Sequence, residues 1–123
     1  MSNAISWFEI PVKNFERAKS FYNTMLATEI KDTPMEGVKY GMFTYDEDNN
    51  AVGGGIIEMT GYTPSENGVL VYLNGGDDLS LPLSRVEKAG GTVVLPKTDI
   101  GENGYMAQVL DTEGNKIALH SWA

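Results

Sequence analysis

The chain reads WFEIPVKNFERAKSFY over residues 7–22, and this stretch decides the fold. Its first part has a two-residue period, which predicts a strand over 6–12 with one apolar face made of Phe8, Ile10 and Val12. Asn14 then stands where a helix N-cap is needed, because its side chain accepts from amides of the first turn. Apolar residues follow at helical spacing, and they predict a helix that ends near Leu26.

The remainder of the chain repeats this order. After the helix, alternation and turn residues predict three strands, over 28–32, 38–45 and 52–59. A polar loop over 61–67 separates them from a second set, in which Asp78 caps a helix that stops at Gly90 and Gly91. The strands predicted for this second set span 68–73, 92–95, 104–110 and 116–120.

The order βαβββ therefore occurs twice, and this repeat determines the predicted architecture. One helix cannot cover both faces of its sheet, so two halves are expected to form a continuous curved sheet with helices outside and a concave face within. We predict an α+β fold with one domain over 1–123. Its modules span 1–60 and 68–123, with a linker over 61–67.

Composition narrows the functions that the chain can have. Nine basic against 17 acidic residues give a net charge of −8, and the basic residues form no stripe. Nucleic acid and anionic membranes are therefore not expected as partners. The sequence has no cysteine, which excludes disulfides and thiolate metal sites. Met1 to Ser6 lacks an apolar signal segment and no run is long enough to span a membrane, so a cytoplasmic protein is expected.

Residues 7–22 resemble the opening strand and helix of the vicinal oxygen chelate superfamily, which includes glyoxalases and bleomycin-resistance proteins. The stretch LDTEGNKIAL over 110–119 resembles the family's Asp-Pro-Asp-Gly-Asn turn and final strand. The predicted helix over 79–89, followed by two glycines, is similar as well. The resemblance spans nearly the whole chain and recurs in both halves.

This resemblance implies a glyoxalase-like fold in which paired βαβββ modules form an open cup around a metal or a ligand. Enzymes of the family use a divalent metal that chelates neighbouring substrate oxygens and stabilises negative charge as it develops. Other members sequester drugs. Small members usually act as homodimers, so the resemblance also implies a homodimer and a small-molecule ligand.

The resemblance places the family's metal ligands at positions that hold other residues here. Trp7 and Ala118 stand at the ligand positions of the first and last strands, and Val71 is the counterpart of Trp7 in the second half. The standard metal site is therefore vacated. We expect a pocket lined by Trp7, Val71, Leu73, Tyr105 and Ala118, with either Tyr105 or its neighbour Met106 pointing inward.

Two neighbouring side chains are candidate substitutes for the missing ligands. Glu9 lies two residues after Trp7 and His120 lies two residues after Ala118, so strand alternation sends both into the cup. With Glu58 as a third ligand, they would hold Zn, Ni, Mn or Fe. Glu9 and His120 are also the candidate catalytic acid and base. Alternatively, His120 is a solvated residue at a strand end, and Glu9 is solvated or paired with Lys116.

Three functions follow from these candidates. The first is an enzyme similar to lactoylglutathione lyase, or to the dioxygenases, that acts on a small molecule through a non-standard divalent metal site. The alternative is a metal-free protein of the bleomycin-resistance type that binds a small hydrophobic or cationic molecule. The third is an interacting subunit whose cup is filled by its own side chains.

Overall fold

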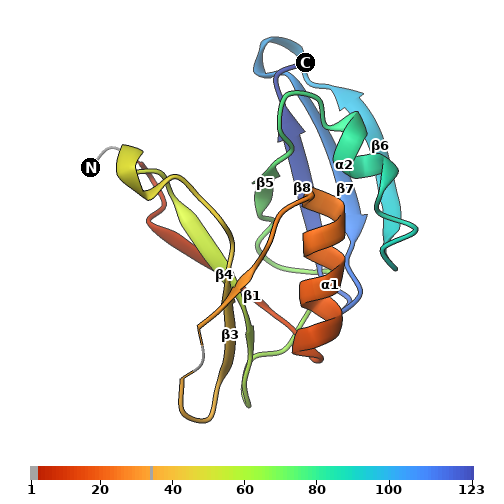
Figure 1. The fold of residues 1–123 in the computed structure, drawn as a ribbon. Helices are drawn as coiled ribbons and strands as arrows, with labels where there is room; N and C mark the ends of the chain where they lie inside the picture. Colours follow the sequence, from red (N-terminus) through yellow and green to blue (C-terminus); the bar gives the residue numbers. More distant parts are fainter. Residues whose placement is uncertain (1–2, 34) are drawn as a thin grey trace.

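The computed structural model describes residues 3–33 and 35–123, which fold into two βαβββ modules (Figure 1). In the first module the elements are β1 (Trp7–Pro11), α1 (Phe15–Leu26), β2 (Lys31–Asp32), β3 (Lys39–Met42), the 3-10 helix η1 (Glu47–Asn49) and β4 (Gly53–Glu58). In the second they are β5 (Tyr72–Asn74), α2 (Ser80–Ser84), β6 (Thr92–Asp99), the 3-10 helix η2 (Gly101–Asn103), β7 (Tyr105–Leu110) and β8 (Lys116–Ser121). No helix within these two ranges has the length and apolar character needed to cross a bilayer.

The two modules have the same sheet topology. Their strand orders are β1-β4-β3-β2 and β5-β8-β7-β6, and in each sheet the first strand of the module runs parallel to the last. The other neighbours pair antiparallel. The predicted α+β class and the βαβββ repeat are confirmed.

The two sheets are separate, however, and do not form the continuous sheet that the sequence pattern suggested. Helix α1 lies between them, and its side chains share one core with both sheets (Figure 1). That core includes Ile10 and Ile56 from the first sheet and Val109, Ile117 and Leu119 from the second. Each sheet therefore turns one face toward α1 and leaves its other face open.

The two helices differ because their sequences support them differently. Asn14 caps α1 by accepting from the Arg17 amide, and Ala27 ends the helix in a left-handed conformation. The predicted second helix is regular only over five residues. The Ser84 hydroxyl donates to the Leu81 carbonyl, and residues 85–90 continue as turns.

A buried polar turn between β7 and β8 joins the modules. The Glu113 carboxylate accepts from the backbone amides of Lys13 and Asn14 and forms an ion pair with Arg17 at 2.7 Å. The Tyr22 hydroxyl of α1 donates to Asp111 at 2.5 Å. These bonds fix where the second sheet sits relative to α1, and so determine which sheet faces remain open.

Candidate functional site

The open face of the first sheet carries two of the predicted site residues. Ile10 and Val12 are buried toward α1, so alternation places Trp7 and Glu9 on the opposite face of β1. Their partners across the parallel pairing are Gly53 and Gly55 of β4. The open face is therefore flat beside Trp7 and Glu9, and other side chains are free to lie over the glycines.

Tyr40 of β3 connects Trp7 and Glu9 in one chain of hydrogen bonds. The Trp7 indole Nε1–H donates to the Tyr40 hydroxyl at 2.8 Å, and that hydroxyl donates to Glu9 Oε2 at 2.8 Å. Burial raises the pKa of the Tyr40 phenol, and the indole donor opposes this while the Glu9 carboxylate adds to it. Tyr40 therefore stays protonated at neutral pH and holds the Glu9 carboxylate in a fixed direction.

The glycine run of β4 explains how aromatic rings fit on both sides of this strand. A Cβ atom on Gly53 would overlap the Tyr45 ring, and one on Gly55 would overlap the Tyr40 ring. On the other face, a Cβ atom on Gly54 would overlap the Phe8 ring. The Trp7 and Tyr45 rings meet edge to face with centroids 5.7 Å apart. The glycines thus create an aromatic surface around Glu9.

The open face of the second sheet carries Ala118 and His120, since Ile117 and Leu119 point into the core. Tyr72 pairs with Ala118 and is 51% exposed. His120 Nε2 lies 2.6 Å from the Asn103 carbonyl oxygen, and its ring meets Trp122 edge to face. Within one chain this face belongs to a different sheet from the one that carries Glu9.

Three predicted pocket residues lie on the other face of the second sheet. Leu73 is buried in the core, and Val71 and Tyr105 pack against it. Val71 and Leu73 thus do not point the same way as Ala118, and of the two alternatives Tyr105 and Met106 it is Met106 that shares the face of His120. Leu79, not Asp78, occupies the N-cap position of α2, and counting seven residues back from it gives Tyr72 instead of Val71. A shift of one residue moves a side chain to the opposite face of a strand.

Glu58 does not join Glu9 and His120, so the expected three-ligand metal site is not assembled in the chain. It shares the α1 side of β4 with Ile56, and its carboxylate accepts from the Phe15 amide at 2.7 Å at the start of α1. Across residues 3–33 and 35–123, no group of three His, Asp or Glu side chains converges on one point. Within one chain these side chains do not fit a divalent metal, because Glu58 caps a helix and Glu9 and His120 lie on separate sheets.

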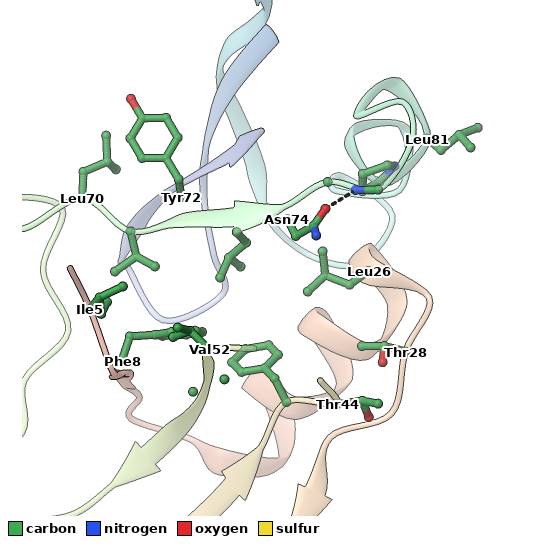
Figure 2. A pocket seen from close by; sticks show the side chains of 18 of the residues that line it. Ile5, Phe8, Leu26, Thr28, Thr44, Val52, Leu70, Tyr72, Asn74 and Leu81 are labelled. Atoms are coloured by element: carbon green, nitrogen blue, oxygen red, sulfur yellow. Dashed lines mark hydrogen bonds between the residues drawn. The ribbon is translucent and has the colours of Figure 1, made fainter. Parts of the chain in front are cut away.

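A cleft of about 830 Å³ lies elsewhere, between the modules. Figure 2 shows Ile5, Phe8 and Val52 on one wall and the β5 segment on the other. Val71, Tyr72 and Leu73 line this cleft, and in Figure 2 the Tyr72 ring extends from β5 away from the wall that carries Ile5 and Phe8. The cleft also exposes apolar side chains, including Val69 at 92% exposure. It is thus distinct from the open face that carries Trp7 and Glu9.

Three aromatic residues of the open faces were not among the predicted site residues. Tyr40 and Tyr45 complete the surface around Glu9, and Tyr72 covers the strand beside Ala118. The alternation of Lys39 to Met42 could have placed Tyr40 on one face, but not beside Glu9, which depends on β4 lying between β1 and β3. For Tyr72, the available signal was a large aromatic residue within the short apolar stretch Val69 to Leu73.

Comparison with known proteins places this geometry in a family. Residues 4–119 match the profile of the Glyoxalase/Bleomycin resistance protein/Dioxygenase superfamily. A curated Mycobacterium tuberculosis protein named "Putative glyoxylase CFP32" is 25% identical over 119 residues, which cover 93% of this chain and 44% of that protein. The chain thus spans less than half the length of this relative.

Solved structures show the same fold at low sequence identity. A glyoxalase/bleomycin resistance protein/dioxygenase family enzyme from Burkholderia phytofirmans PsJN superposes with a TM-score of 0.71 at 14% identity, covering 96% of this chain and 98% of that one. TnmS3, an antibiotic binding protein from Streptomyces sp. CB03234, superposes with a TM-score of 0.63 at 21% identity, covering 100% and 99%. Both likenesses concern the fold alone.

Proposed function

Because the chain belongs to the Glyoxalase/Bleomycin resistance protein/Dioxygenase superfamily, we propose that it binds a small organic molecule without a metal. The observation that carries this proposal is the open face of the first sheet. Tyr40 binds Glu9 and Trp7 there, Tyr45 packs against Trp7, and Trp7 occupies a position that the family resemblance assigns to a metal ligand. Aromatic walls with one fixed polar group are typical of small-molecule sites.

The comparison with TnmS3 supports a binding role for this fold. TnmS3 is an antibiotic binding protein, and this chain covers it almost end to end. Aromatic rings supply a large apolar contact area, and a ligand stacked on Trp7 and Tyr45 would bury them further. The same resemblance also supports sequestration, since holding a ligand needs no catalytic group.

The proposed site is completed by a second copy of the chain. The faces that carry Glu9 and His120 belong to separate sheets with α1 between them, so one chain presents two half-sites. Both β1 and β5 are edge strands, and the apolar cleft between the modules runs beside them. A second copy that packs on this cleft would cover Val69 and bring the two kinds of open face together.

A lyase-like enzyme with a divalent metal is the other function that the family offers. Its expected ligands are Glu9, Glu58 and His120, and Glu58 is already bound to the Phe15 amide on the opposite face. No observation on the side chains favours this function over binding. We therefore derive no catalytic step through a metal.

A thermal-shift screen of chelator-treated protein tests the proposed function. The panel contains neutral and cationic aromatic compounds. Each is added at a concentration well above the largest dissociation constant that the screen is meant to detect. A ligand that binds only the native state raises the midpoint of unfolding, and Trp7→Ala should abolish the increase. Val94→Ala, which shortens an exposed apolar side chain on the outer edge strand β6, is the control. No stabilisation by any compound would contradict a binding function.

A further inference from the structure

We propose that the ligand held on the first sheet is an organic cation, with its positive group against Glu9 and its apolar part on the rings of Trp7 and Tyr45. This inference rests on the proposed function and names its ligand class. The carboxylate of Glu9 is exposed and lies among aromatic side chains. Ring faces and a carboxylate both attract cations, so together they select for positive charge.

The Glu9 carboxylate has a vacant side for such a cation. Tyr40 binds Oε2, and among the described residues Oε1 accepts no hydrogen bond and neither oxygen forms an ion pair. The Tyr40 hydroxyl accepts from Trp7 and donates its only proton to Glu9. The carboxylate is therefore held in place by a neutral group that leaves its charge uncompensated.

Nearby lysines do not provide that charge. Lys31 shares the open face and lies in the same row across the sheet, as Glu9 pairs with Gly55, Gly55 with Met42 and Met42 with Lys31. Three strand spacings separate Glu9 from Lys31, or roughly 14 Å. Lys39 alternates with Tyr40 and so points to the other face.

The glycines of β4 bring aromatic rings close to the side of Glu9. Gly55 is the direct neighbour of Glu9 and has no side chain to cover it, and the Tyr40 ring lies over this glycine. The cation would then contact the edge of the carboxylate and the face of at least one ring.

Two isosteric probes separate charge from shape. Benzyltrimethylammonium and neopentylbenzene differ only in the replacement of the charged nitrogen by carbon. Titration of chelator-treated protein, followed by Trp fluorescence or calorimetry, should show the cation binding about tenfold more tightly than the neutral probe. Added salt should weaken the binding of the cation and leave the binding of the neutral probe unchanged.

Two variants with the same net charge identify the residue that causes the preference for the cation. Glu9→Gln should reduce the preference for the cation to about twofold or less, because the amide keeps the size of the side chain but not its charge. Glu66→Gln removes one acidic charge from an exposed loop and should leave the preference unchanged. Equal losses in both variants would mean that only the net charge of −8 attracts the cation.

The outcomes distinguish this inference from the proposed function. Equal affinity for the two probes, or a preference that survives Glu9→Gln, overturns the organic-cation inference alone. Stabilisation by neutral compounds without any binding of the cation also overturns the organic-cation inference. That outcome leaves the proposed function standing. If neither the probes nor the wider panel binds, both proposals fail.

Discussion

At the scale of single residues, the side chain that matters most to the architecture is Glu113. Its side chain is fully buried, and its two oxygens accept from Arg17, Thr112 and the backbone amides of Lys13 and Asn14. Burial alone would raise the pKa of this carboxyl, but these donors outweigh burial and lower the pKa to about 2. Glu113 is therefore charged in the folded protein down to strongly acidic pH.

We predict that Glu113→Gln destabilises the chain by about 2 kcal/mol at pH 7, the usual loss for hydrogen bonds to a charged group. The folded-state pKa is lowered from an ordinary value of 4.5, so the charged form stabilises the fold above that pH. This contribution is lost as the pH falls from 4.5 toward 2. Urea unfolding at pH 7 and pH 3 should thus show a gap between wild type and variant that shrinks in acid.

The control for this prediction is Glu102→Gln, which changes an exposed carboxylate by the same charge. It should leave the free energy of unfolding within about 0.5 kcal/mol of wild type at both pH values. A gap for Glu113→Gln that is equal at the two pH values would show that its charge does not stabilise the fold.

At the scale of elements, strand β4 has glycines at the positions where aromatic rings of neighbouring segments pack against it. We predict that Gly54→Ala costs about 1–3 kcal/mol of stability, because the new Cβ atom would overlap the Phe8 ring in a packed core. Denaturant titration of the single and double variants with Phe8→Leu measures the coupling. The double variant should lose less than the sum of the two single losses; strict additivity would contradict the proposed overlap.

Elements whose signals are local were predicted well, and the others were not. The Asn14 cap and the apolar stripe of α1 lie within one stretch of chain, and both are confirmed. Glu58 was misplaced because Ile56 and Ile57 are both buried, so alternation gives no indication of which face of β4 is covered. The contact between Tyr40 and Glu9 depends on a strand order that no local pattern specifies.

In the second half of the candidate site, local sequence pattern also did not determine which side chains of β5 lie on the open face. The face of β5 was inferred by counting back from Asp78, and Asp78 indeed accepts from the Ser80 amide. The helix itself begins one residue later than that count assumed. A single residue of error in a loop containing Gly75 and Gly76 was enough to exchange Val71 for Tyr72 on the open face.

At the scale of the whole molecule, the separation of the two open faces leads to a prediction about assembly. We expect a homodimer in solution, because the apolar cleft beside β1 and β5 would otherwise leave Val69 in water. Light scattering during gel filtration should give the mass of a dimer for the wild type and a lower mass for Val69→Asp. Val94→Asp, at an exposed valine on the edge strand β6, is the matched control. A monomeric wild type would contradict this assembly.

The central claim is that a small molecule binds on the open face of the first sheet without a metal. Proton–nitrogen correlation spectra of chelator-treated protein test it most directly, since the Trp7 indole N–H that donates to Tyr40 gives its own signal. On titration with a compound from the thermal-shift screen, this signal should move among the most of any in the spectrum. Shifts confined to the cleft residues Val69 to Leu73, with the Trp7 indole unmoved, would contradict the claim.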